Sequence, residues 1–219
     1  MSTTEENIRA YSTPASVMAY SSDYLRSGER DVIDKYMNRG TRVLDLGCGT
    51  GRTTYYIYKN GASVTGVDPA ISLIKKGGEL HPELELVVGD ARKLDFPDDY
   101  FDTVFFSFNG LDNLYPIEER LSTLREMWRV MKKNGHLVYS SHNSLALPRT
   151  FTGLKFFLDN IFRLRLGLHW RREVHSFGTL LLYYNNPKSE RILTESQDFK
   201  FVEMVGGMYD KFPLYVFKK

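Results

Sequence analysis

The chain has 219 residues, 42% of them hydrophobic and 26% charged, with a formal net charge of +2. This length and balance favour one sizeable α/β domain and exclude a largely disordered chain. The near-neutral charge argues against a general attraction to nucleic acid, and the single cysteine excludes an intrachain disulfide.

The N-terminus and the hydropathy predict a cytoplasmic protein. Residues 1–14 have no apolar core and include Glu5 and Glu6, so a secretory signal is not expected. No window approaches the roughly 20 unbroken apolar residues of a membrane span. We therefore expect no membrane partner, while the oligomeric state is left open by the sequence.

From residue 42 onward, apolar β-branched runs alternate with stretches typical of helices. The expected strands are 42–46, 62–68, 84–90, 101–108 and 136–141, then a closing hairpin of 199–206 and 213–218. The expected helices are 52–60, 69–80 and 117–135, the last ending at Gly135. Strands that alternate with helices predict a mostly parallel sheet covered on both faces.

Residues 143–186 are longer than one crossover connection needs, so they predict an insertion over the carboxyl ends of the strands. An apolar stripe at helical spacing comprises Phe151, Leu154, Phe157, Leu158 and Ile161, and residues 149–172 carry six basic residues against Asp159. Three interpretations stay open: a helical lid packed on the sheet, a lid whose arginines receive an anionic small molecule, or a surface for a membrane or nucleic acid. The near-neutral overall charge argues against the third.

The segment RVLDLGCGTG (42–51) ends an apolar run in a glycine-rich turn. Ligands of open α/β sheets bind outside the carboxyl ends of the strands, and glycines let the backbone approach them closely. We expect Asp45 to face this crevice, where a carboxylate would repel a pyrophosphate and suit an ammonium or sulfonium group. S-adenosyl-L-methionine carries both groups and no phosphate. Alternatively, Asp45 only accepts hydrogen bonds from amides of the glycine turn.

Two further acidic residues end the next two expected strands. Asp68 follows the glycine turn by about 20 residues, where a carboxylate binds ribose hydroxyls, or it caps the helix that begins near Pro69. Asp90 could reach the amino group of adenine beside the backbone amide of Ala91, or it could cap a short turn. Acidic residues at three successive strand ends favour an adenosine cofactor.

The segments VLDLGCGTG, GVDPA, GDARKLDFPDDYFDTVFFSFNGL and LREMWRVMKKNGHLVY resemble the successive motifs of class I S-adenosylmethionine-dependent methyltransferases. The resemblance covers roughly residues 30–142. It implies an α/β, Rossmann-like sheet of seven strands in the order 3-2-1-4-5-7-6, with helices on both faces. We therefore expect one methyltransferase domain over 1–219, with an N-terminal lid at 1–28 and a helical insertion at 143–186.

The resemblance also implies which residues contact the cofactor. The residues that it implies are Asp45, Gly47, Gly49, Asp68, Asp90, Ala91, Ser107, Phe108 and Asn109. We add Cys48 and Pro69, which lie in the same turns. Tyr20 or Arg26 could meet the methionine carboxylate, or the tyrosines nearby could form a docking strip. Where the family usually has Lys-Pro-Gly-Gly, this chain has Lys132-Lys133-Asn134-Gly135, which we expect to alter only turn geometry.

Methyl transfer from a sulfonium depends mainly on positioning, and a general base helps when the acceptor is a hydroxyl of high pKa. The candidate bases are Asp112 and His142, although Asp112 could cap a turn and His142 could be a structural histidine. The segment after the fourth strand lacks the Asn/Asp-Pro-Pro-aromatic motif of DNA and some protein N-methyltransferases. The remaining histidines have no ligand spacing, so we expect no metal site.

The sequence thus predicts methyl transfer from S-adenosyl-L-methionine to an oxygen or nitrogen of a small-molecule acceptor. A nicotinamide-dependent oxidoreductase is the main competing hypothesis. Asp45 and the glycine spacing, which is G-x-G-x-G and not G-x-G-x-x-G, argue against it. A non-catalytic cofactor-binding subunit and an RNA methyltransferase also stay open, although nucleic acid is not an expected partner.

Overall fold

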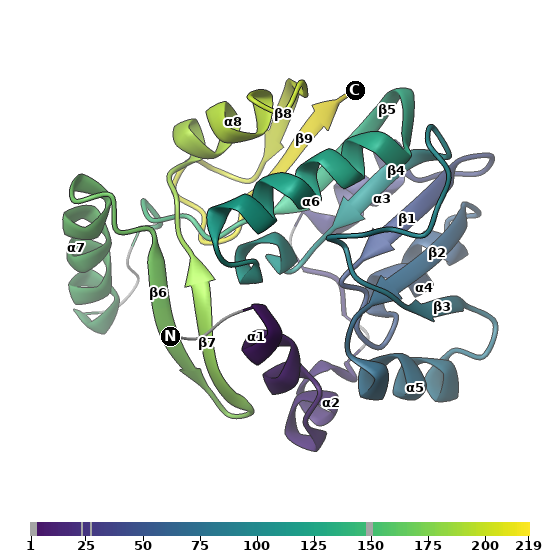
Figure 1. Ribbon diagram of the computed structural model, residues 1–219, viewed down its shortest axis with the longest axis horizontal. Helices are drawn as coiled ribbons and strands as arrows, with labels where there is room; N and C mark the ends of the chain where they lie inside the picture. The colour runs from purple at the N-terminus through teal and green to yellow at the C-terminus, as the bar shows by residue number, and fades with distance from the viewer. Residues whose placement is uncertain (1–3, 23, 27, 148–150) are drawn as a thin grey trace.

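The computed structural model describes residues 4–22, 24–26, 28–147 and 151–219, apart from the side chains of 151 and 152. Its main sheet has seven strands in the order β3-β2-β1-β4-β5-β9-β8 (Figure 1). They are β1 (Arg42–Leu46), β2 (Ser63–Asp68), β3 (Glu85–Val88), β4 (Phe101–Phe106), β5 (Met131–Ser140), β8 (Lys200–Val205) and β9 (Leu214–Lys218). Strand β9 is antiparallel to both of its neighbours, and the other pairs are parallel. Because β8 and β9 are the closing hairpin, the predicted fold and strand order are confirmed.

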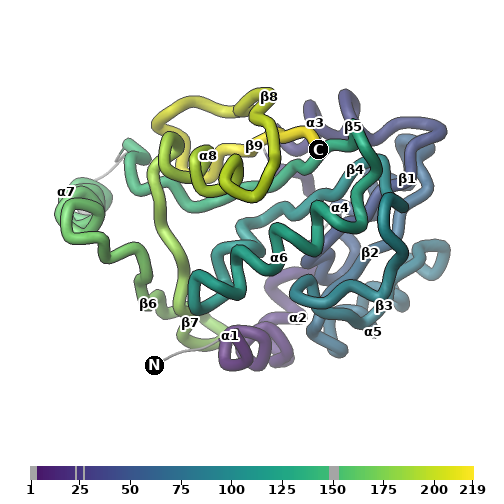
Figure 2. The backbone as a smooth tube through the Cα atoms, turned by 45° about the horizontal axis from the view of Figure 1, so that its top comes forward, coloured from purple at the N-terminus to yellow at the C-terminus, as the bar shows by residue number. Residues whose placement is uncertain are grey.

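Helices cover both faces of this sheet (Figures 1 and 2). They are α3 (Glu29–Tyr36) and α4 (Arg52–Lys59) on one face, α6 (Ile117–Val130) and α8 (Pro187–Glu195) on the other, and α5 (Ile71–Leu80) beside β2 and β3. Each face has its own apolar core, since Ile33 and Ile57 pack in one cluster and Leu124 and Met127 in the other. The sheet is therefore buried on both sides, as a parallel sheet requires.

Alternation along β1 decides where its side chains point. Val43 belongs to the α3–α4 cluster, whereas Leu44 and Leu46 belong to the α6 cluster. Successive side chains of a strand point to opposite faces, so Asp45 shares the side of Val43 and faces α4. This placement determines what the Asp45 carboxylate can contact.

The helix expected over 117–135 ends earlier than predicted. Helix α6 ends at Val130, and β5 begins at Met131, which pairs with Phe101 of β4. Gly135 lies within β5, where a Cβ atom would come within 2.9 Å of the Asp102 carbonyl oxygen, so this glycine permits a close strand approach and does not cap the helix. The apolar side chain of Met131 fits the helical period, but strand pairing prevails.

The insertion is not purely helical, which corrects the prediction. It holds α7 (Phe151–Arg165) and a separate two-stranded sheet of β6 (Trp170–His175) and β7 (Gly178–Tyr183). Helix α8, which follows it, is absent from the sequence-based expectations. Arg149 and the side chain of Phe151 lie outside the described residues. None of the helices in the described part of the chain is long and apolar enough to cross a membrane.

The N-terminal segment forms α1 (Thr4–Tyr11) and α2 (Pro14–Tyr20), which lie beside β7 and the carboxyl ends of the main strands (Figure 1). Buried Asn7 fixes α1: its Nδ2 donates to the carbonyl oxygens of Asn113 and Leu181 at 2.9 Å, and its Oδ1 accepts from the Leu181 amide at 3.0 Å. One polar side chain therefore joins the N-terminal segment to the insertion and to the 3-10 helix η1 (Gly110–Asn113).

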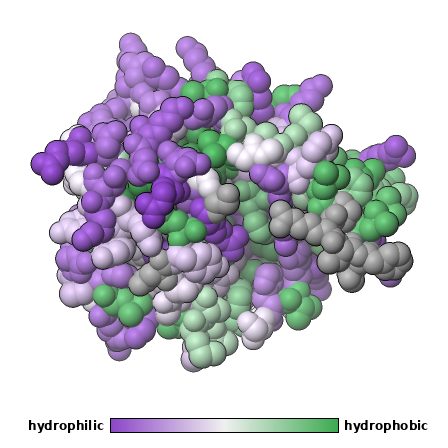
Figure 3. All heavy atoms as spheres, turned by 180° about the vertical axis from the view of Figure 1, so that it is seen from behind, coloured by the Kyte–Doolittle hydropathy of each residue, from purple (hydrophilic) through white to green (hydrophobic). Residues whose placement is uncertain are grey.

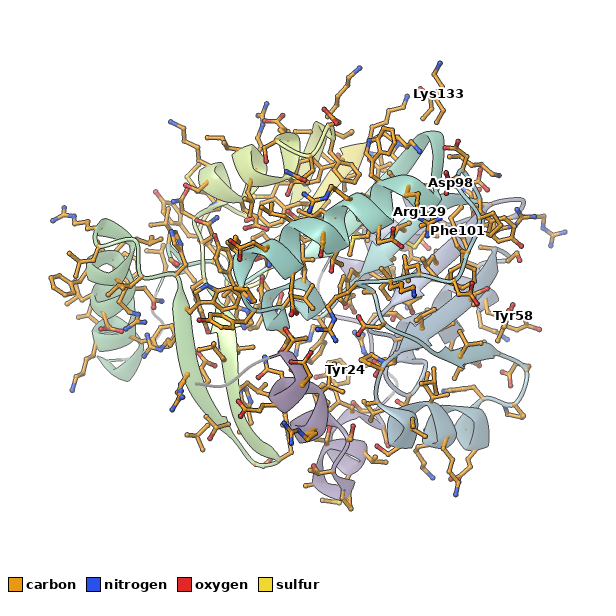
Figure 4. All side chains as sticks on the ribbon, in the orientation of Figure 1. Tyr24, Tyr58, Asp98, Phe101, Arg129 and Lys133 are labelled. Carbon is orange, nitrogen blue, oxygen red and sulfur yellow. The ribbon has the colours of Figure 1, made fainter. Side chains whose placement is uncertain are left out.

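At the other end of the sheet, Arg129 holds the connection between β3 and β4 (Figure 4). Its guanidinium donates to the carbonyl oxygens of Leu94 and Phe96 and pairs with exposed Asp98 at 2.8 Å. These contacts fasten a connection that contains no helix, away from the carboxyl ends of the strands.

Candidate functional site

A cavity with an empty volume of about 1040 Å³ lies at the carboxyl ends of the central strands. The residues after β1, β2, β3 and β4 line it, together with the N-terminal helices and η1. This is where ligands bind in open α/β sheets.

The glycine turn forms one wall of this cavity. Gly47 has a φ of +61°, and a Cβ atom there would lie 2.7 Å from the Phe106 ring, so glycine is required. Asp68, at the end of β2, accepts from the Gly49 amide at 2.9 Å and from the Ala70 amide at 2.8 Å. Burial raises the pKa of Asp68 to about 6, although these two amides act in the opposite direction. The carboxylate lines the cavity, and no cation within the described residues pairs with it.

Asp45 does not line the cavity, contrary to the expectation that it faces the crevice. It is fully buried, and its Oδ2 accepts from the hydroxyls of Thr53 at 2.8 Å and Thr54 at 2.7 Å, both on α4. Burial raises its pKa to about 6. Its donors are hydroxyls of α4 and not amides of the glycine turn, because strand alternation directs it to the α4 side. The Asp45 carboxylate is therefore separated from the cavity and does not face a bound ligand directly.

Asp90 lines the cavity but is already engaged by Arg92. The Arg92 Nη2 lies 2.7 Å from Asp90 Oδ2, and its Nε lies within 3.0 Å of both oxygens. Burial would raise the pKa of Asp90, but Arg92 holds it below the ordinary value. Arg92 also pairs with Glu5 of α1, so this ion pair links the third strand end to the N-terminal segment.

The N-terminal helices supply a further wall of the cavity. Tyr11 and Tyr20 line the cavity, and their rings are in edge contact at 5.7 Å. The Tyr20 carbonyl oxygen accepts from the Thr50 hydroxyl at 2.7 Å. The C-terminal end of α2 is thereby attached directly to the glycine turn.

A second cavity, with an empty volume of about 1330 Å³, adjoins the first at Ser107. Ser107 donates to Glu29, whose carboxylate also receives two hydrogen bonds from Arg52 at 2.6 and 2.8 Å. Arg26 lines this second cavity, and its guanidinium carbon lies 3.4 Å from the centre of the Phe108 ring. The Ser107–Glu29–Arg52 chain therefore lies at the junction of the two cavities.

Most of the predicted cofactor residues come together on the first cavity. Those that line it are Tyr20, Gly47, Cys48, Gly49, Asp68, Pro69, Asp90, Ala91, Ser107 and Phe108. Arg26, Asp45 and Asn109 do not line it, and Asn109 is buried with a φ of +60°. The sequence reasoning missed other lining residues, among them Asn7, Thr50, Arg52 and Asn113. Thr50 and Arg52 lie within or directly after the glycine turn, whose motif could have indicated them, whereas Asn7 and Asn113 carry no local signal and only the fold could find them.

The two candidate bases lie together in a buried charged network. Asp112 is fully buried, and its Oδ2 lies 2.7 Å from His142 Nδ1 and accepts from the His142 amide at 2.7 Å. Its Oδ1 accepts from Arg120 at 2.7 Å, and Arg120 also pairs with Glu190. Burial alone would raise the pKa of Asp112, but Arg120 and His142 hold it below the ordinary value. The Asp112 carboxylate is thus ionised and orients the imidazole.

His142 packs between aromatic rings near the second cavity. Its ring centre lies 4.6 Å from that of Tyr184 and 5.2 Å from that of Phe212, a residue that lines this cavity. The side chain keeps 10% of its surface exposed, whereas Asp112 has none. Neither candidate lines the first or the second cavity, and of the two only the His142 side chain reaches the surface. Within the described residues, no group of three or more His, Cys, Asp or Glu could hold a metal ion.

Comparisons with known proteins agree with this geometry. Residues 43–135 match a family model described as a methyltransferase domain. The chain is 39% identical over 97 residues to demethylmenaquinone methyltransferase of Streptomyces griseus, which covers 44% of this chain and 40% of that protein. It is 40% identical over 110 residues to phosphatidylethanolamine N-methyltransferase of Cereibacter sphaeroides, covering 48% and 52%. The chain thus spans about half the length of these curated relatives.

Among solved structures, the CcbJ methyltransferase from Streptomyces caelestis superposes with a TM-score of 0.69 at 17% identity, over 95% of this chain and 97% of that one. This likeness concerns the fold. Residues 43–135 thus match a methyltransferase domain, and the chain as a whole shares the fold of a known methyltransferase.

Proposed function

We propose that this protein transfers a methyl group from S-adenosyl-L-methionine to an oxygen or nitrogen of a small-molecule acceptor. The observation that carries the proposal is Asp68: a buried carboxylate on the wall of the first cavity, beside the glycine turn and without a cationic partner in the described part of the chain. Such a carboxylate fits ribose hydroxyls, which can donate to its remaining lone pairs. When bound, the cofactor supplies an activated methyl group.

The chain's own residues would orient the reactants and exclude water. Asp90 and Ala91 would lie near the adenine, and the glycine turn and Tyr20 near the methionine part. The N-terminal segment would act as a lid, a role supported by the Tyr20–Thr50 and Asn7–Leu181 hydrogen bonds. Ser107, at the junction of the two cavities, would lie close to where methyl group and acceptor meet.

His142 would act as the general base when the acceptor loses a proton. Ionised Asp112 accepts from Nδ1–H, which leaves Nε2 as the basic nitrogen. Asp112 is then a positioning residue, because it is fully buried. For the identity of the acceptor, the names of the relatives make demethylmenaquinone and phosphatidylethanolamine the first compounds to test.

Calorimetry with S-adenosylhomocysteine and with NADH tests the cofactor class. We expect binding of S-adenosylhomocysteine only, and tight binding of NADH alone would overturn the proposal in favour of an oxidoreductase. Labelled methyl transfer to metabolite pools then tests catalysis. Transfer that occurs only when RNA is present would replace the small-molecule acceptor by RNA, and cofactor binding without any transfer would indicate a non-catalytic subunit.

A further inference from the structure

Helix α7 lies at the edge of the molecule, away from the main sheet (Figures 1 and 2). It is held by its inner face alone. Buried Asn160 accepts from Arg171 of β6 at 3.0 Å, and the Phe156 ring packs against Tyr184 with ring centres 6.0 Å apart. The outer face therefore has no covering element among the described residues.

This outer face is apolar. Leu154, Leu158 and Phe162 follow one another at intervals of four residues, so they form one stripe along the helix. They are 41%, 58% and 62% exposed, and Leu166 just beyond the helix is 57% exposed. Seen from behind, hydrophobic side chains gather at the edge where α7 lies (Figure 3). Exposed apolar residues scattered singly are ordinary, but a continuous stripe marks an interaction surface.

Basic residues share the face of the stripe. At about 100° per residue, Lys155 and Arg165 point to the same side as the three apolar residues. Both are exposed, and neither forms an ion pair within the described part of the chain. Asp159, the one acidic residue between 153 and 172, pairs with Arg171 at 2.9 Å. The stripe therefore carries an uncompensated positive charge.

From this combination we propose that the α7 stripe, Leu154, Leu158, Phe162 and Leu166 with Lys155 and Arg165, docks the protein on the surface of an anionic lipid bilayer. Apolar side chains enter the boundary between headgroups and acyl chains while lysine and arginine meet anionic headgroups. A second copy of the chain fits less well, because a two-fold interface on this face would oppose like charges. The inference goes beyond the proposed reaction and is independent of it.

The near-neutral net charge, which argued against a membrane at the level of the sequence, describes the whole molecule. A bilayer meets one face, and charge beyond a Debye length, about 10 Å, is screened from it. What decides docking is therefore the local charge of α7, and this becomes visible only when the exposed face of the helix is known.

Vesicle sedimentation tests the inference directly. The full chain should bind vesicles made of equal parts phosphatidylglycerol and phosphatidylcholine, should not bind phosphatidylcholine vesicles, and should be released at high salt. Leu158→Glu with Phe162→Glu should abolish binding. Lys155→Glu with Arg165→Glu should weaken it by about tenfold or more. The matched control is Ile192→Glu, an apolar residue 56% exposed on α8, which should bind like the unchanged protein.

Two further measurements keep the outcomes distinct. Circular dichroism should show all variants folded, because the replaced side chains are exposed, and S-adenosylhomocysteine affinity should be unchanged, so that failure of docking and failure of the proposed reaction are separate results. Wild-type protein that ignores anionic vesicles, or a stripe variant that binds them fully, would overturn the inference. Light scattering would also overturn the inference if it showed that the unchanged protein is a dimer and that the stripe substitutions only convert it to a monomer.

Discussion

Two groups of buried carboxylates behave differently in this molecule. On the glycine-turn side, Asp45 and Asp68 accept only from hydroxyls and backbone amides of the described residues, and burial raises the pKa of each to about 6. On the insertion side, Asp112 and Glu190 share the fully buried Arg120, and the pKa of Asp112 is lowered. A buried carboxylate without a cationic partner costs free energy, and hydrogen-bond donors of a ligand can offset this cost. A buried carboxylate that is paired with a cation instead stabilises the fold.

Of the substitutions that test this difference, Arg120→Met should have the largest effect. It leaves Asp112 and Glu190 buried without their cation, which should lower the free energy of unfolding by about 3–5 kcal/mol in urea denaturation. Arg125→Met, on the same helix but exposed, should change it by no more than about 0.5 kcal/mol. Equal stability of the two variants would contradict a framework role for the Arg120 cluster.

Replacing His142 by glutamine tests whether this histidine, which contacts the buried Asp112, acts as the general base. If the imidazole accepts the acceptor's proton, kcat should fall by about 100-fold. S-adenosylhomocysteine affinity should stay the same, because His142 does not line the first cavity. A variant with unchanged turnover would leave positioning alone as the source of catalysis.

Replacing Asp68 by alanine tests the glycine-turn side. Loss of a charge-assisted hydrogen bond to ribose should weaken S-adenosylhomocysteine binding by about 1–3 kcal/mol, measured by calorimetry. Asp98→Ala, an exposed carboxylate at the opposite end of the sheet (Figure 4), is the control and should bind normally. Unchanged affinity in the Asp68 variant would refute its assigned role.

The smallest expected effect is a pH dependence of cofactor binding. The raised pKa of Asp68 means that its ionised form, which accepts from ribose hydroxyls, is lost as the pH falls through about 6. Affinity for S-adenosylhomocysteine should therefore drop by about tenfold from pH 7 to pH 5, where one unit of pKa is worth about 1.4 kcal/mol. Asp68→Asn should remove this dependence, whereas Asp45→Asn should retain it.

Stability of the ligand-free protein should respond to pH in the opposite sense. A folded-state pKa raised above the unfolded value of about 3.9 means that the folded chain binds more protons between these two values. The contribution of Asp45 and Asp68 is therefore fully present below about pH 4 and is lost as the pH rises through about 6. Urea denaturation of Asp45→Asn should show a smaller loss over this interval than the unchanged protein.

The glycine turn and the strand ends could be predicted because their signals are local. Positive φ at Gly47 and the cap-like hydrogen bonds of Asp68 depend on residues within the same two turns. The end of α6 could not be predicted, because Met131 fits the apolar period of the helix and also belongs to the strand that pairs with Phe101. The β6–β7 hairpin was missed because it lies outside the main sheet and only partly alternates in burial.

The sequence by itself determined the succession of strands and helices along the chain, the glycine turn and the acidic residues near the strand ends, since turn chemistry and apolar periodicity act over a few residues. The order of the strands within the sheet followed only from the resemblance to the methyltransferase family. The tertiary structure alone decided the direction of Asp45, the docking of Asn7 against Leu181, and the Arg120 cluster. Arg120 of α6 is fully buried, and its partner Glu190, 70 residues away in the sequence, packs against it. Burial of a charge depends on what packs across it, and that partner is set by the fold.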